Sequence, residues 1–547
     1  MRITATLATL LILIPVVSAL SCNQQPGGSG QASGTGAASG GTRGTWWAPL
    51  GNAGRDCYFA GTGIDDPAML FRHYIPAPAE FPQYAASAPV CDGDDTCYVL
   101  ATAIPGSKKI KHEKQLLKAA GSDVNLEELL LRSLSDGEGY FTEALRDALS
   151  PKQAWLYALA SDGKCKWIYK ADGAVQAGPI VTRNGDILFA THNIYCQHPN
   201  LDNIELEDLE NLADWPTETQ AGIYLVNQRG KLIRKLDTGS SLAQLAITKN
   251  DMVIALTYHD PEPDEEILVA SRLVAMNLDG DELWAKQLET AHQRLACATD
   301  QICLAVENRD PAPDSSAIIH SEIYSLDAAT GERVWTFDCE TDGIWGLICS
   351  DSGNIYGALE TDIYGNGYDN NLPLSQRLKL HNTRGRLVCL DHTGKLQWQA
   401  FTIAGTLGRL AAGADGTVYA VCEEYRAAEP PMFGEYSSFA DMETTRYLQA
   451  FSATGVRTWR YDLSSEQRGV TILEDTCLSV DEAGNVYLVA ANDALNTVYP
   501  ATLVSLFPGG SERWAYYLRG YADSLGFRND GAVVVTVLDH VYCLGQR

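Results

Sequence analysis

Positive charge is scarce in this sequence. Its 547 residues include 41 Lys and Arg against 69 Asp and Glu, so the formal net charge at pH 7 is −28. Such a chain repels phosphate backbones, and no basic stripe along the sequence offsets the repulsion. The composition therefore argues against nucleic acid as a partner.

The apolar run near the start of the sequence, residues 7–17, is too short for a membrane-spanning helix and is broken by Thr9 and Pro15. Arg2 precedes it and small residues follow it, which is the order of an export signal. We therefore expect residues 1–21 to be a signal peptide.

Cys22 follows this run directly and precedes a Gly/Ser-rich stretch with almost no apolar residues. The order resembles a bacterial lipoprotein signal, although Ala19 stands where the usual pattern has Leu. We expect Cys22 to be lipidated and residues 22–45 to be a flexible tether, which anchors the protein to a membrane of the bacterial cell envelope. Cleavage after Ala19 by ordinary signal peptidase is the alternative, and it would give a periplasmic or extracellular protein.

Fourteen cysteines fit an exported protein, because disulfides persist outside the cytoplasm. Two pairs share one spacing, Cys91 with Cys97 and Cys297 with Cys303, and each pair flanks a turn between two short apolar runs. A disulfide across each hairpin is the favoured interpretation. A structural zinc site is the rival, but the six-residue separation and the lack of nearby His do not suit it.

An internal repeat governs the rest of the chain. Seven segments combine an apolar alternating strand, a polar turn with Gly, and a second strand with an aromatic position four residues after the Gly. That position is Trp in six segments and Arg234 in the other. The six tryptophans are Trp167, Trp284, Trp335, Trp398, Trp459 and Trp514.

A second hairpin alternates with the first, at eight turns such as Asn184-Gly185 and Asp530-Gly531. Two hairpins per unit give four antiparallel strands, which is one blade of a β-propeller. The eighth unit is split, because residues 541–545 form a third strand with no fourth strand after them. Residues 70–74 can supply that fourth strand and close the ring, which removes two exposed sheet edges.

The segment from Ser325 to Trp335 resembles the tryptophan-docking repeat of quinoprotein-like (PQQ-repeat) propellers, and residues 390–398 match it with one residue deleted. The resemblance covers residues 46–547 and implies an all-β, eight-bladed propeller, which we expect to be monomeric. It also implies that each Trp packs on the neighbouring blade, while the Asp, Thr and Gly of the repeat shape the turn. Those turn residues are Asp327, Thr330, Gly331, Asp391 and Gly394.

Two absences bear on catalysis in that family. The sequence has no adjacent Cys-Cys pair and no Cys-x-x-Cys-His haem attachment. Bound PQQ is therefore not expected, and the resemblance points to the non-catalytic branch that includes the outer-membrane assembly lipoprotein BamB. We expect a protein-binding or scaffolding module that holds envelope proteins through its inserted loops. A quinone-dependent oxidoreductase, or another enzyme built on the propeller top, is the alternative.

Three insertions are candidates for function. Residues 107–153, within blade one, are predicted to be helical. Asp362, Asn366 and Asp369 lie in a loop rich in oxygen ligands that resembles a calcium loop, although a turn-rich loop without metal is the simpler interpretation. Residues 425–447 carry Phe433, Tyr436 and Phe439, which either anchor a partner or fold back onto the propeller.

Overall fold

The computed structural model describes part of the chain, all of it within the unit Gly41–Arg547. The described residues are 57–75, 83–85, 87–103, 153–192, 222–236, 241–258, 271–288, 292–298, 300–309, 318–340, 342–361, 374–402, 405–427, 442–462, 470–471, 477–492, 501–519, 522–537 and 540–547.

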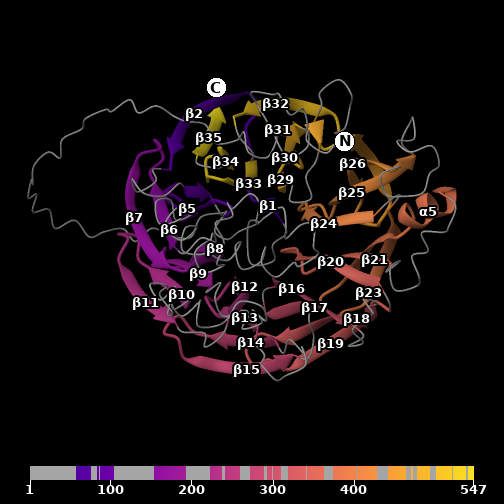
Figure 1. Ribbon diagram of the computed structural model, residues 1–547, viewed down its shortest axis with the longest axis horizontal. Coiled ribbons are helices and arrows are strands. Elements are labelled where there is room, and N and C mark those ends of the chain that lie inside the picture. The colour runs from indigo at the N-terminus through magenta and orange to yellow at the C-terminus, as the bar shows by residue number, and fades with distance from the viewer. Residues whose placement is uncertain are drawn as a thin grey trace, which may run out of the picture. The chain divides into compact units, whose positions relative to one another are not determined.

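Eight antiparallel sheets are arranged around one axis, and each contributes four strand positions from the inside outward (Figure 1). Blade one contains β3 (Gln83–Ala85) and β4 (Val90–Cys91), which share the inner position, then β5 (Cys97–Ala103), β6 (Gln153–Leu159) and β7 (Cys165–Asp172). Blade two contains β8 (Ala174–Val181), β9 (Ile187–His192), β10 (Gly222–Val226) and β11 (Leu232–Leu236). Blade three contains β12 (Ser241–Ile247), β13 (Val253–Tyr258), β14 (Ser271–Met276) and β15 (Glu282–Leu288).

The remaining blades repeat this order. Blade four contains β16 (His292–Cys297), β17 (Gln301–Arg309), β18 (Ile318–Asp327) and β19 (Arg333–Asp338), and blade five contains β20 (Asp342–Cys349), β21 (Ile355–Thr361), β22 (Gly385–Leu390) and β23 (Leu396–Phe401). Blade six contains β24 (Gly405–Ala412), β25 (Val418–Ala427), β26 (Met442–Phe451) and β27 (Arg457–Asp462). Blade seven contains β28 (Val470–Thr471) and β29 (Leu478–Asp481), then β30 (Val486–Asn492), β31 (Ala501–Leu506) and β32 (Glu512–Leu518).

Blade eight joins the two ends of the described chain. It contains β33 (Ala522–Phe527), β34 (Val533–Val537), β35 (His540–Gln546) and, as its outer strand, β2 (Pro67–Tyr74). The strands β2 and β35 pair antiparallel, with Ala68 opposite Gly545 and Tyr74 opposite His540. A short strand before β2, β1 (Tyr58–Phe59), adds to blade seven by parallel pairing with β29.

The repeat turn shows why its residue types recur. The carboxylate of Asp327 accepts hydrogen bonds from the Thr330 amide at 2.9 Å, the Thr330 hydroxyl at 2.9 Å and the Ala329 amide at 3.1 Å. These bonds stabilise the charged form and lower the pKa of Asp327. Gly331 closes the turn with a φ of 71°, in a region that side chains disfavour.

The eight-bladed all-β propeller predicted from the repeat is confirmed. The inner two or three strands of each blade are almost wholly buried, and polar and exposed residues concentrate on the fourth strand. The predicted helical insertion lies outside the described residues except for Gln153, which begins β6. A helix that the sequence analysis missed, α5 (Leu374–His381), precedes β22 in blade five.

The predicted loop 425–447 is shorter than expected. The hairpin of β25 and β26 continues through Tyr425 opposite Thr444 to Ala427 opposite Met442. The alternating pattern of the two strands extends the ladder, so the flanks of this insertion are strand. Among the described residues, no helix is both long and apolar enough to cross a membrane.

Candidate functional site

Neighbouring blades meet at a seam, where the outer strand of one blade packs on the next blade. Seams are numbered here by the earlier blade. At seam one, Trp167 on β7 donates its indole Nε1–H to the carbonyl oxygen of Gln228 in blade two, at 2.7 Å. The same bond recurs elsewhere: Trp284 to Ala328 at 2.9 Å, Trp335 to His392 at 3.0 Å, Trp459 to Pro508 at 2.7 Å and Trp514 to Ile64 at 3.0 Å.

The glycine of the neighbouring turn is required because the indole lies directly against it. A Cβ atom built on Gly230 would stand 2.7 Å from the ring of Trp167. Equivalent ring contacts link Gly331 to Trp284, Gly394 to Trp335, Gly455 to Trp398 and Gly510 to Trp459. Six of the eight seams are therefore sealed by tryptophan.

Seam two departs from this arrangement. Arg234 holds the tryptophan position on β11, and Leu236 lies against the turn glycine of blade three, Gly280. A Cβ atom on Gly280 would stand 2.5 Å from Leu236 Cδ2 but 3.8 Å from Arg234 Cδ. The leucine covers the glycine, whereas the guanidinium turns away from it.

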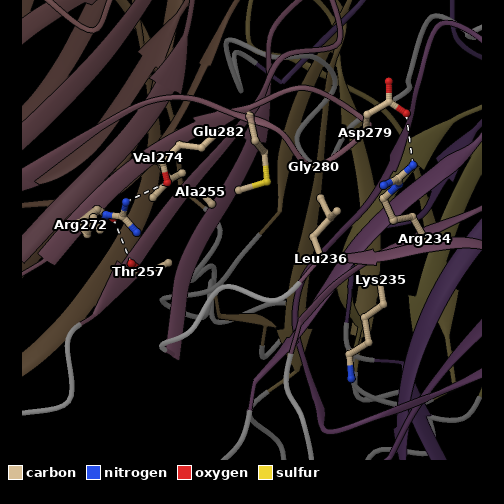
Figure 2. A pocket seen from close by; sticks show the side chains of 11 residues that line it. Arg234, Lys235, Leu236, Ala255, Thr257, Arg272, Val274, Asp279, Gly280 and Glu282 are labelled. Carbon is tan, nitrogen blue, oxygen red and sulfur yellow. Dashed lines mark hydrogen bonds and ion pairs between the residues drawn. The ribbon is translucent and has the colours of Figure 1, made fainter.

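A cavity of about 290 Å³ lies at seam two, between β11 and the outer strands of blade three (Figure 2). Its apolar lining comes from Leu236 on one side and from Ala255, Val274 and Met276 on the other. Its charged rim comes from Arg234, Lys235, Arg272, Asp279 and Glu282. Thr257 also lines the cavity. The sequence analysis singled out Arg234 as the exception in the repeat but did not predict this cavity.

The charged groups of the rim form two exposed ion pairs. Arg234 Nη2 lies 3.4 Å from Asp279 Oδ1, and these side chains are 45% and 78% exposed. Arg272 Nη2 lies 2.8 Å from Glu282 Oε2, again between half-exposed side chains. Exposed pairs of this kind contribute only about 0–1 kcal/mol each, so either can open to admit a ligand at little cost.

Seam eight, where the ring closes, has its own chemistry. Phe71 on β2 takes the place of the tryptophan and packs on Gly163 of blade one. Two predicted disulfide partners lie in the same apolar cluster: Cys91 and Cys97 are opposite each other on β4 and β5, with their Sγ atoms 2.8 Å apart. Burial raises the pKa of the Cys91 thiol.

The second predicted pair is less directly aligned. Cys297 ends β16 opposite Ile302, and Cys303 on β17 lies opposite Ala296, so the two cysteines are diagonal neighbours in the ladder. Both side chains are buried. Disulfides at either pair stay predictions.

An aromatic residue on an inner strand was also missed by the sequence analysis. Trp345 sits at a bulge of β20, between Ile344 and Gly346, and is 51% exposed. Its carbonyl oxygen accepts a bond from Arg294 Nε of β16 at 3.4 Å. A bulge re-aims one side chain out of the alternation, and the sequence signal was the neighbouring Gly346.

Other predicted site residues lie outside the described residues. They are the lipidation site Cys22, the calcium-loop residues Asp362, Asn366 and Asp369, and the aromatic residues Phe433, Tyr436 and Phe439. Within the described ranges, no group of three or more His, Cys, Asp or Glu is placed to hold a metal ion.

Comparisons with known proteins place this geometry in context. A family model described as outer membrane protein assembly factor BamB matches residues 319–542, from blade four to blade eight. No curated protein sequence matches the chain.

Solved structures are similar at low identity. BamB from Moraxella catarrhalis is 14% identical with a TM-score of 0.41, and the match covers 72% of this chain and 91% of that one. Quinohemoprotein alcohol dehydrogenase from Comamonas testosteroni is 11% identical with a TM-score of 0.47, and the match covers 93% of this chain and 81% of that one. At these identities the likeness is limited to the fold.

Proposed function

We propose, from the premise that this chain is a PQQ-like β-propeller, that it serves as a protein-binding or scaffolding module of the bacterial cell envelope. The observation that carries the proposal is the family match over residues 319–542, whose description is that of an outer membrane assembly factor. A factor of that kind acts on other proteins rather than on a small substrate.

Surface chemistry supports the same function. Trp345 exposes half of its surface on an inner strand, and seam two presents a cavity that combines apolar side chains with a charged rim. Large exposed aromatic side chains and small pockets that accept them are typical anchor points of protein interfaces. Both features lie on rigid strands, which hold a binding surface in one geometry.

Membrane attachment is the second part of the proposal. Export through residues 1–21 and lipidation at Cys22 would hold the propeller at a membrane, with residues 22–45 as its tether. Cells that express the full chain are labelled with tritiated palmitate and fractionated. The label and the membrane location should be lost in Cys22→Ser and retained in Cys165→Ser, which removes an exposed thiol of β7. A mature chain that begins at Leu20 without lipid would contradict the anchor.

Protein binding is tested by cross-linking in intact cells. The full chain is cross-linked under mild conditions and purified from the membrane fraction, and its protein and small-molecule contents are identified by mass spectrometry. The proposal predicts reproducible envelope proteins in stoichiometric amounts. A stoichiometric quinone or metal without any protein partner would overturn it and favour an enzyme.

A further inference from the structure

We propose that the cavity at seam two is a binding site for a partner segment that inserts one aromatic side chain and carries a carboxylate beside it. The inference rests on the proposed protein-binding function and names the chemistry of the partner.

The other seams show what such a position holds. At four of them, an indole lies on the turn of the next blade and donates its N–H to a carbonyl oxygen two or three residues before the turn glycine. Blade three keeps this turn, with Gly280 at a φ of 85° and Leu278 at the acceptor position. Because β11 brings Arg234 in place of an indole, the second seam retains the docking turn but lacks the aromatic ring.

The cavity has the size and lining for one aromatic side chain. An apolar cavity of about 150 Å³ holds a benzene ring, so a volume of about 290 Å³ has room for an indole and part of its backbone. Leu236, Val274 and Met276 offer apolar contacts to such a ring, and methionine sulfur makes favourable contacts with aromatic edges.

The rim selects for negative charge. Three cations, Arg234, Lys235 and Arg272, face two carboxylates, Asp279 and Glu282, around the cavity. The guanidinium groups can stack on an inserted ring, and a carboxylate next to that ring can replace Asp279 or Glu282 in the exposed ion pairs. A partner with basic flanks would leave both pairs intact and gain nothing from them.

The surface beside the cavity extends the apolar contact. Leu232 and Ile233 precede Arg234 on β11, and each is close to half exposed. Leu283 follows Glu282 on β15 with a similar exposure. Because successive side chains of a strand point to opposite faces, a segment that leaves the seam along β11 can cover Leu232 or Ile233 but not both.

The test uses short peptides and the full chain. The probe is acetyl-Glu-Trp-Glu-amide with 5-fluorotryptophan, and its ¹⁹F signal is followed as the protein is added. We expect saturable broadening with a dissociation constant on the order of 1 mM, as for a single anchor. Unlabelled acetyl-Glu-Trp-Glu-amide should displace the probe, whereas acetyl-Glu-Ala-Glu-amide should not. The lysine-flanked analogue should bind about two- to fivefold more weakly, because an exposed ion pair contributes at most about 1 kcal/mol.

Two variants separate the cavity from general stability. Arg234→Trp introduces the indole found at other seams. It should fill the cavity and weaken binding of the probe by about tenfold or more. Arg234→Ala keeps the room but removes a cation, so it should still bind the ring while losing most of its preference for acidic flanks. Arg457→Trp adds a tryptophan at an exposed position of β27 and should bind like the unmodified chain. Melting temperatures show that each variant is folded.

The outcomes separate this inference from the function on which it rests. Equal displacement by the alanine peptide, or unchanged binding by Arg234→Trp, would overturn the aromatic site. If envelope proteins cross-link equally to the unmodified chain and to Arg234→Trp, the proposed function stands and this site is wrong. If no envelope protein cross-links to the unmodified chain, the proposed function itself fails.

Discussion

Seams one and two of this propeller are neighbours and are closed by different chemistry. At seam one, Trp167 packs on Gly230 and bonds to Gln228, whereas at seam two Arg234 turns outward and Leu236 alone covers Gly280. The turn glycine is the same in both, so the difference comes from one strand position. The ring closes with two seams that lack an indole, seam two and seam eight, where Phe71 packs on Gly163 and β2 pairs with β35.

The largest effect is expected where the tryptophan is most buried. Trp514 is 9% exposed and bonds to Ile64, so Trp514→Ala should lower the free energy of unfolding by about 3–5 kcal/mol. Arg234→Ala, at the equivalent position of seam two, should change it by no more than about 0.5 kcal/mol. Urea unfolding of both variants measures the two changes in the free energy of unfolding. Equal decreases would mean that Arg234 stabilises seam two as much as Trp514 stabilises seam seven.

Seam eight should respond to oxidation. A disulfide between Cys91 and Cys97 would add about 2 kcal/mol to the stability of the chain, through a short closed loop. Urea unfolding with and without dithiothreitol measures this difference, and Cys91→Ser with Cys97→Ser should abolish it. Peptide mapping that joins either cysteine to a different partner would contradict the predicted bridge.

Restoring the indole should stabilise seam two. Arg234→Trp fills the cavity, and filling changes of this kind commonly add about 0.5–2 kcal/mol. Arg457→Trp, at an exposed position, is the control and should leave the free energy of unfolding unchanged. A loss of stability in Arg234→Trp would show that Leu236, which covers Gly280, leaves no room for an indole.

The smallest effect concerns pH at seam eight. Burial lowers the pKa of His73 on β2, and a nearby His540 lowers it further, while a hydrogen bond to the backbone of Gly163 opposes the shift. The folded chain then binds fewer protons than the unfolded chain, so stability should fall as the pH drops through about 6.5. His73→Gln should remove that part of the pH dependence, whereas the exposed His320→Gln should not. Unfolding curves at pH 8 and pH 5 compare the unmodified chain with the two variants.

The blades could be predicted from sequence because each repeats a local code. Turn residues such as Asp327 and Gly331 fix the hairpins, and alternating apolar residues fix the strands between them. The pairing of residues 70–74 with the last strand followed from the count of strands per blade, and the structure extends that strand to Pro67–Tyr74. The helix α5 was missed because the segment has weak amphipathic character and follows a turn-rich loop.

The candidate site was less predictable. The exception at Arg234 is visible in the repeat, yet whether a neighbour fills the vacant space depends on how Leu236 and Met276 pack across two blades. Trp345 was missed for a similar reason, since a bulge in β20 reverses the direction expected from alternation. Both features arise between strands that are paired or packed in space, and no local pattern specifies them.

A photo-cross-linking measurement in cells tests most directly whether seam two binds protein. Benzoylphenylalanine is placed at Leu283, which is 49% exposed and follows the cavity residue Glu282 in sequence, and in a matched chain at Val456, 62% exposed in the outer turn of blade six. The account predicts a specific adduct with an envelope protein from position 283 that is strongly reduced by Arg234→Trp. Equal adducts from both positions, or an adduct from position 283 that Arg234→Trp leaves unchanged, would contradict it.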